Sequence, residues 1–270
     1  MNQCGLNVEF SDHSYSNTTG YGATAKEKAS DLNACFANPK YKAIICAKGG
    51  ANCNSVFEYL DYDLISRNSK ILCGFSDSTS ITNMITEKSG IVTFNGPTFK
   101  SFSSWDTDYA FKKFVKRFME DDMSLYDEDD IVEIINPGEA IGELVGGNLC
   151  LTDRMCAGKY NLNFKDKILF LEELGFESEP EMCSGNLYHM KQCGVFDEIN
   201  GIWLGNYEHE TGIALEKIIL DVLDGEYNLP IIKTNNFGHI DKKIVIPVGI
   251  MAKIDTNAET KIELLEKCLK

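Results

Sequence analysis

Ser76 stands where a serine hydroxyl could act as a nucleophile. The apolar run 70–75 predicts a short strand, residues 74–78 a tight turn and residues 79–85 a helix. A serine at such a turn projects its Oγ from the sheet, and the amide of Asp77 would lie at a helix N-terminus, where negative charge is stabilised. The pattern Gly74-x-Ser76-x-Ser78 differs from the G-x-S-x-G elbow at its fifth position alone. Ser and Asp are also preferred helix caps, so a cap without chemistry is the alternative.

A serine nucleophile needs a base, and histidine is the side chain whose pKa suits that role. The chain has four histidines, His13, His189, His209 and His239. The first three lie in a polar loop, on a predicted helix and in a polar turn, whereas His239 follows Gly238 between two predicted strands. Glu172 directly follows the apolar run 167–171 and is the candidate acid that orients His239. The order Ser, acid, His occurs in hydrolase triads on α/β sheets. The alternative interpretation makes Glu172 a polar loop residue and His239 a turn residue.

The glycine pair Gly49-Gly50 follows the predicted buried strand 41–47. Glycines at the carboxyl end of a strand let backbone amides face a ligand, and open α/β sheets bind ligands at that edge. The pair is therefore a candidate binding turn, and a simple connecting turn is the alternative.

The order of predicted elements indicates the fold class. Strands and helices alternate through the first half, which is typical of a parallel sheet covered by helices on both faces. We therefore expect an α/β protein with a Rossmann-like N-terminal domain at 1–135 that carries Ser76. A smaller C-terminal α/β domain at 136–270 is expected to carry Glu172 and His239. Within the first domain, a short strand is expected at 6–10 and a helix at 56–65.

Composition excludes several classes of function. The chain has 270 residues, and its formal net charge of −15 repels phosphate backbones, so nucleic acid is not an expected partner. It has neither an apolar run of membrane-spanning length nor a signal sequence, so a cytoplasmic protein without a membrane partner is expected. The 10 cysteines include no C-x-x-C pair and are expected to be buried reduced thiols. No metal-ligand spacing occurs either, so neither a metal nor a cofactor is predicted.

Several sequence blocks resemble the LD-carboxypeptidase family of serine peptidases, which includes the microcin C self-immunity peptidases. The blocks are 43–54 (AIICAKGGANCN), 60–79 (LDYDLISRNSKILCGFSDST), 90–97 (GIVTFNGP), 146–149 (GGNL), 167–173 (KILFLEE), 194–205 (GVFDEINGIWLG) and 237–249 (FGHIDKKIVIPVG). They span nearly the whole chain in the family's order, which makes the resemblance more specific than any single motif.

The resemblance implies a role for each candidate residue. Ser76 would be the nucleophile, His239 the general base and Glu172 its orienting acid. The Asp77 amide and a backbone amide of the Gly49-Gly50 turn would form the oxyanion hole. Family members place the serine in an N-terminal domain and the acid and histidine in a C-terminal domain, and are commonly dimers, so a homodimer is expected.

The chain also departs from the family pattern. Family chains usually begin with a further strand and helix, so the N-terminus is expected to be short. Ala51 stands where the family often has an aromatic residue, whereas Asn52 and Asn54 are more similar to the microcin-immunity branch. That branch's tryptophan-bearing loop has only the displaced Trp105 as a counterpart.

The sequence therefore predicts a serine-type carboxypeptidase that hydrolyses an amide bond of a small peptide-like substrate such as a murein tetrapeptide. The first alternative is a microcin C-type hydrolase of peptidyl or aminoacyl nucleotides that gives self-immunity. The second is an inactive family member that binds a ligand without turnover. A domain that binds a phosphorylated metabolite at the Gly49-Gly50 turn is a third alternative.

Overall fold

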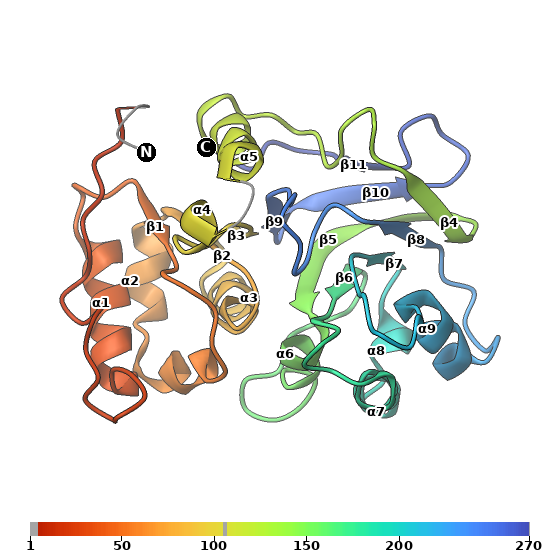
Figure 1. Cartoon of the computed structure of the whole chain (residues 1–270), viewed down its shortest axis with the longest axis horizontal. Helices are drawn as coiled ribbons and strands as arrows, with labels where there is room; N and C mark the ends of the chain where they lie inside the picture. The colour runs from red at the N-terminus through yellow and green to blue at the C-terminus, as the bar shows by residue number, and fades with distance from the viewer. Residues whose placement is uncertain (1–4, 105–106, 270) are drawn as a thin grey trace.

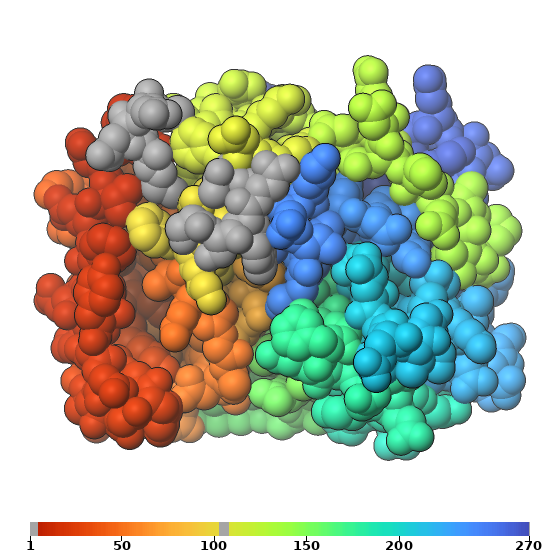
Figure 2. Space-filling model, in the orientation of Figure 1, coloured from red at the N-terminus to blue at the C-terminus, as the bar shows by residue number. Residues whose placement is uncertain are grey.

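A computed structural model describes residues 5–104 and 107–269 of the chain. Within these residues the strands form two sheets, one of four strands in the order β1-β2-β3-β9 and one of seven in the order β11-β10-β5-β6-β7-β8-β4. Figure 1 shows the first sheet on the left and the second on the right, with helix α3 between them. The N-terminal and C-terminal halves of the chain accordingly occupy opposite sides of the face seen in Figure 2.

The four-stranded sheet comes mainly from the first hundred residues. This part of the chain contains the strands β1 (Ala43–Ile45), β2 (Ile71–Gly74) and β3 (Thr93–Asn95). Its helices are α1 (Ala25–Ala37), the 3₁₀ helix η2 (Cys53–Tyr59), α2 (Tyr62–Arg67) and α3 (Ser78–Ser89). Strands β1, β2 and β3 are parallel, as the alternation of strand and helix predicts. Strand β9 (Ile246–Val248) returns from the C-terminal half and pairs antiparallel with β3. The chain downstream of β8 is thereby tied to the sheet whose strand β2 leads into Ser76.

The seven-stranded sheet is built from the second half of the chain. Its strands are β4 (Val132–Asn136), β5 (Glu139–Asn148), β6 (Ile168–Glu172), β7 (Gly201–Leu204), β8 (Ile231–Thr234), β10 (Met251–Asp255) and β11 (Ile262–Leu264). Strands β5 to β8 are parallel, and β4, β10 and β11 pair antiparallel at the two sides. Two helices precede these strands in the chain, α4 (Ser101–Ser104) and α5 (Thr107–Met119). Four more connect the parallel strands: α6 (Leu149–Asp153), α7 (Pro180–Gln192), α8 (Val195–Glu198) and α9 (Leu215–Leu223).

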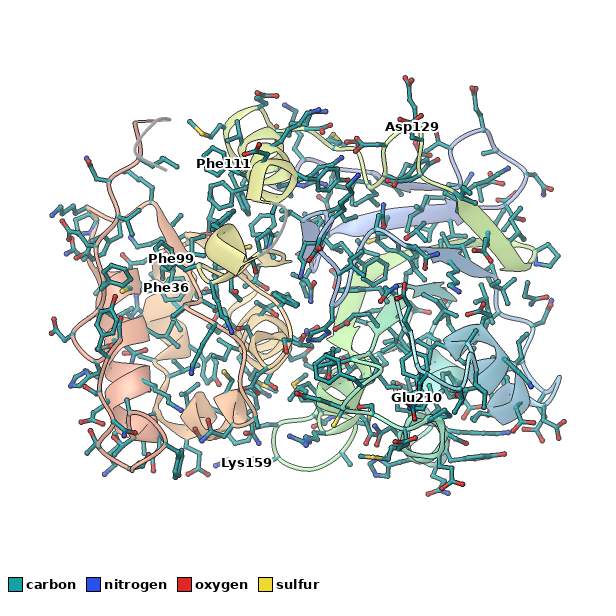
Figure 3. The ribbon with its side chains drawn as sticks, viewed as in Figure 1. Phe36, Phe99, Phe111, Asp129, Lys159 and Glu210 are labelled. Atoms are coloured by element: carbon teal, nitrogen blue, oxygen red, sulfur yellow. The ribbon has the colours of Figure 1, made fainter. Side chains whose placement is uncertain are left out.

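Side-chain alternation along the central strands explains why the second sheet is buried on both faces. In β6, Leu169 and Leu171 belong to one hydrophobic cluster and Ile168 and Phe170 to the other. Successive strand residues point to opposite faces, so a continuous apolar run fills two cores at once. The first cluster also contains Phe36 of α1, labelled in Figure 3, so one core runs through both halves of the chain.

The predicted fold class is confirmed as α/β, with a full-length structural match described below. In strand number, however, the C-terminal sheet is the larger one, whereas a smaller domain was expected there. The division at 135 stays a prediction. Strand β4 spans that position, and β9 crosses to the first sheet.

Two predicted elements are wrong, and the strand predicted to be buried at 41–47 is β1, whose residues are exposed or half-buried. Residues 6–10 are irregular rather than a strand. The side chain of Glu9 accepts hydrogen bonds from Lys40 and Tyr41, and Phe10 packs on Phe99 with ring centroids 5.4 Å apart (Figure 3 labels Phe99). Residues 56–65 are not one helix, because η2 ends at Tyr59 and α2 begins at Tyr62. The side chain of Asp61 caps α2 by accepting from the Leu64 amide, which fixes the break.

Candidate active site

The segment around Ser76 has the strand, turn and helix that its sequence predicts. Strand β2 ends at Gly74 and α3 begins at Ser78. Ser76 has a φ of 61°, in the left-handed region that non-glycine residues rarely adopt. A Cβ at position 74 would lie 2.8 Å from the Cβ atoms of both Cys46 and Ser78, so only glycine fits there. A sharp, strained turn of this kind is how a nucleophilic serine is presented at the edge of a sheet.

His239 reaches Ser76 from the loop that follows β8. We call residues 236–244 the histidine loop, because the Ile244 amide donates to the Asn236 carbonyl at 2.9 Å and closes it. Gly238 has a φ of 116°, and a Cβ there would lie 3.0 Å from Glu172 Oε2. Glycine therefore lets the backbone pass close enough to Glu172 for the next residue to bond with it.

The three predicted side chains form one chain of hydrogen bonds. His239 Nε2 lies 3.0 Å from Ser76 Oγ, and His239 Nδ1 lies 2.7 Å from Glu172 Oε2. Glu172 is the last residue of β6, and its side chain is 1% exposed, whereas that of His239 is 10% exposed. An ionised carboxylate can only accept, so the Nδ1–H donates to Glu172 and Nε2 is left to accept from the serine hydroxyl.

The charges around His239 act in opposite directions. Burial lowers the pKa of His239, but the Glu172 carboxylate, through its charge and its hydrogen bond, outweighs burial and raises the pKa above the ordinary value.

The adjacent Glu173 bonds to other groups. Its carboxylate accepts from Asn148 Nδ2 at 2.7 Å and from the amides of Cys150 and Leu174 at 3.0 and 2.8 Å. Burial raises the pKa of Glu173 despite these bonds, and the residue holds β6 to the start of α6.

The Gly49-Gly50 turn lies against the serine. A Cβ at position 49 would be 3.0 Å from Ser76 Oγ, and one at position 50 would be 2.9 Å from Asp77 Oδ2. The Asp77 carboxylate accepts from the amides of Asn52 and Cys53 at 2.9 and 3.0 Å, so it fixes the end of the turn. The sequence suggested the Asp77 amide as an oxyanion donor and the Asp77 side chain as a helix cap, but the side chain makes no capping hydrogen bond. Its role in the turn was missed, because the residues next to Ser76 in the sequence give no signal for it.

Each histidine of the chain lies beside a carboxylate. His13 bonds Asp31 at 2.7 Å, His189 bonds Asp153 at 2.7 Å, and His209 Nε2 lies 3.1 Å from Glu179. None of these three contacts Ser76, whereas His239 does. His189 Nε2 instead lies 3.5 Å from the thiol of Cys193. A histidine paired with an acid is therefore common in this molecule, and contact with Ser76 distinguishes His239.

The cysteines of the described residues are free and differ in burial. Cysteines 35 to 268 are free, but three of these nine are buried and Cys193 is exposed, so the expectation of uniform burial is wrong. In residues 5–104 and 107–269, no group of three His, Cys, Asp or Glu residues could hold a metal ion. The same described residues include no helix long and apolar enough to cross a bilayer. Cys4 and Trp105 lie outside the described residues.

The fold and these side chains define an α/β protein in which a serine at a strand-to-helix turn faces a buried histidine and glutamate. Two family models match the chain: the LD-carboxypeptidase N-terminal domain over residues 1–96 and the LD-carboxypeptidase C-terminal domain over residues 141–254. The chain belongs to the LD-carboxypeptidase family, which confirms the resemblance found in the sequence.

Relatives in other organisms match most of the chain. A putative carboxypeptidase of Treponema pallidum is 31% identical over 94% of this chain and 81% of its own length. A probable murein peptide carboxypeptidase of Bacillus subtilis is 27% identical over 97% of this chain and 84% of its own. The microcin C7 self-immunity protein MccF of Escherichia coli is 27% identical over 86% of this chain and 76% of its own. The family and these names class the chain with the hydrolases.

Solved structures extend the match to the fold. MccF in an inactive mutant apo state has a TM-score of 0.89 at 24% identity, over 100% of this chain and 89% of that chain. MccF in complex with aspartyl sulfamoyl adenosine has a TM-score of 0.80 at 25% identity, over 92% of this chain and 83% of that chain. The α/β architecture of this chain is therefore that of the family along its whole length.

Proposed function

We propose that this chain is a serine-type carboxypeptidase that hydrolyses an amide bond of a small peptide-like substrate such as a murein tetrapeptide. Ser76 would be the nucleophile, His239 the general base and Glu172 the acid that orients it. The observation that carries the proposal is the continuous hydrogen-bond chain from Ser76 Oγ through His239 to Glu172, at 3.0 and 2.7 Å. Family membership and a relative named as a murein peptide carboxypeptidase support the substrate class.

The reaction would proceed by acyl transfer. His239 Nε2 takes the proton of Ser76 as Oγ bonds to the scissile carbonyl carbon, and the carbonyl oxygen becomes an oxyanion. The carbon–nitrogen bond then breaks, and the leaving amine takes the proton from His239. A water molecule gives its proton to His239 and attacks the acyl ester, which releases the carboxylic acid and restores the Ser76 hydroxyl.

The oxyanion would be held by backbone amides. The Asp77 amide lies in the turn that opens α3, where the helix dipole favours negative charge. The Gly49-Gly50 turn would supply the second donor, since it packs against Ser76 Oγ without a Cβ between them. Two donors fixed before reaction stabilise developing charge without reorganising, which is why such sites contribute strongly to rate.

Hydrolysis of a peptidyl or aminoacyl nucleotide, which would give microcin self-immunity, is the second candidate function. MccF, which is 27% identical, is named as a microcin self-immunity protein, and its structure in complex with aspartyl sulfamoyl adenosine matches this chain with a TM-score of 0.80. Both candidates use the same acyl-transfer chemistry and differ in the group that flanks the scissile bond.

One parallel assay separates these candidates. The purified protein is incubated with a muropeptide and, separately, with aspartyl sulfamoyl adenosine, and product masses are measured. Loss of the terminal residue from the muropeptide supports the carboxypeptidase, and release of aspartate from the nucleotide supports the second candidate. Binding of either compound without any product would support the inactive alternative.

Ser76→Ala is the control in both incubations. We expect it to keep the fold and lose turnover, and a serine-directed phosphonate to label Ser76 alone in the unmodified protein. Full turnover by Ser76→Ala would refute the serine mechanism.

We also propose that the protein acts in the cytoplasm and that it forms a homodimer, because family members are commonly dimers. Light scattering of the purified chain tests the dimer, and a monomeric mass at assay concentration would contradict it.

A further inference from the structure

A lysine is buried beneath the candidate active site. Lys243 is 2% exposed, and it lies four residues after His239 at the end of the histidine loop. Lysine is rarely buried to this extent unless its ammonium group has compensating charges, because removing that group from water is costly. The neighbouring Lys242 is exposed and serves as a reference for an ordinary lysine of the same loop.

The ammonium group of Lys243 packs against the residue that precedes the nucleophile. Its Nζ lies 3.6 Å from the centroid of the Phe75 ring, within the range of a cation–π interaction. The Phe75 ring also contacts the imidazole of His239, with centroids 5.2 Å apart and planes inclined at 60°. Phe75 therefore links the lysine at one end of the histidine loop to the histidine at its centre.

More negative than positive groups act on Lys243 and His239. The charges of Glu172 and Asp241 act on Lys243, and those of Glu172, Glu173 and Lys243 act on His239. Burial lowers the pKa of Lys243 to about 7, although Glu172 and Asp241 act to raise it, so the side chain carries its positive charge in the acidic range. Among the ionisable groups that act on His239, the two carboxylates raise its pKa and Lys243 lowers it. Lys243 is thus the positive charge that opposes the two glutamates.

We propose that Lys243 is a positioning residue of this site, whose ammonium group, held against Phe75, offsets the charge of the buried Glu172 carboxylate beside His239. Without that positive charge, the imidazolium form of His239 would be favoured by two carboxylates and opposed by burial alone. A general base that holds its proton too tightly is inactive over more of the acidic range. Lys243 would therefore extend the range in which His239 can accept the serine proton. This role rests on the proposed function of His239.

The alternative is that Lys243 only anchors the histidine loop. An anchor would affect stability and the rate at every pH alike, whereas a charge that acts on His239 would shift its titration. Histidine titration therefore distinguishes the two roles, and it needs no turnover. The four histidine signals of the full-length protein can be followed by NMR with labelled histidine, and His239→Gln identifies the signal of position 239.

The test compares Lys243→Met, Lys243→Arg and the matched variant Lys242→Met with the unmodified protein. We expect Lys243→Met to raise the pKa of His239 by about one unit, the size typical of one nearby charge. Lys243→Arg keeps the charge, so the pKa of His239 should stay close to that of the unmodified protein. Lys242→Met should leave the titration of His239 unchanged. With an active substrate, the acidic limb of kcat/KM should move upward by the same amount in Lys243→Met.

An unchanged His239 titration in Lys243→Met would overturn the proposal, and so would an equal shift in Lys242→Met. If Lys243→Met does not fold, Lys243→Gln removes the charge but keeps a polar end and takes the same titration. The outcome is separate from that of the proposed function. Turnover that persists in Ser76→Ala refutes the peptidase mechanism, whereas the titration of the unreacted protein still decides whether Lys243 acts on His239.

Discussion

Two regions of this molecule have the same sequence of chemical groups. At the candidate active site, His239 places Nε2 at 3.0 Å from the Ser76 hydroxyl and Nδ1 at 2.7 Å from Glu172. On the surface, His189 places Nε2 at 3.5 Å from the Cys193 thiol and Nδ1 at 2.7 Å from Asp153. Each is a nucleophile, an imidazole and a carboxylate in one row.

The two rows differ in burial and in the backbone that carries the nucleophile. The side chains of His239 and Glu172 are 10% and 1% exposed, whereas those of His189 and Asp153 are 49% and 13% exposed. Ser76 precedes the N-terminus of α3. Cys193 is instead the C-cap of α7, and its amide already donates to carbonyls of that helix. A helix C-terminus disfavours negative charge and offers no free amide donors. Hydrogen-bond connectivity alone therefore does not make a site for acyl transfer.

Removing each nucleophile gives the largest contrast between the two regions. We expect Ser76→Ala to reduce kcat/KM by about 10³-fold or more, because loss of a triad nucleophile leaves only binding and oxyanion stabilisation. Cys193→Ala should leave kcat/KM within about twofold, because Cys193 lies outside the site. Steady-state hydrolysis by the two variants measures the difference. A comparable loss in both would show that the surface row takes part in the reaction.

Removing each carboxylate's charge should give the next largest contrast. Glu172→Gln keeps the shape of the side chain but can stabilise the wrong tautomer of His239, so kcat should fall by roughly 10²- to 10⁴-fold. Asp153→Asn makes the same change beside His189 and should leave kcat unaltered. Activity retained by Glu172→Gln would mean that His239 does not depend on its acid.

A glycine substitution tests the turn that only the first region has. The Cβ introduced by Gly50→Ala would lie 2.9 Å from Asp77 Oδ2, which two amides hold in place, so the turn must shift. We expect a loss in kcat of up to about 10³-fold, because removing an oxyanion donor costs roughly 10²- to 10³-fold. Gly185→Ala in α7 is the matched control, since its Cβ would meet nothing within 4 Å. That control should keep full activity and unfold at a slightly higher temperature, whereas equal losses in both variants would contradict the role of the turn.

The pH dependence of the reaction should show the smallest effect. As the proposed base, His239 would accept the serine proton in its neutral form, and its pKa is raised above the ordinary value of 6.5. The kcat/KM value should therefore fall as the pH drops, with its acidic limb above 6.5. His189→Gln should leave the limb where it is. A limb at or below the ordinary value, or one that moves in His189→Gln, would argue against His239 as the base.

Local sequence patterns predict most of the elements named from them. The apolar run before Ser76 and the small polar residues after it predict β2, the turn and α3, and the run before Glu172 predicts β6. The pattern at 6–10 predicts a strand as well, but there the side chains of Glu9 and Phe10 instead contact Lys40, Tyr41 and Phe99. Local pattern cannot show whether a strand finds a partner, because pairing depends on distant segments.

Lys243 shows the same limit at the candidate site. The sequence Asp241-Lys242-Lys243 is typical of an exposed loop. Lys242 is indeed exposed, but Lys243 is buried against Phe75. The carboxylate of Asp77 was likewise missed, because its partners are the amides of a turn that lies 24 and 25 positions away. In both cases the chemistry depends on contacts that sequence spacing does not contain.

The sequence by itself determined the local geometry of this protein: a serine at a strand-to-helix turn, an acid at a strand end, and a histidine after a glycine that permits close approach. The sequence also favoured His239 among the four histidines. Only the tertiary structure decided that its imidazole meets Ser76, 163 positions away, while the other three pair with carboxylates elsewhere, and which of two adjacent lysines is buried. The reason is that strand propensity and turn chemistry act between neighbours in the chain. Burial and charge pairing arise only when distant segments pack together.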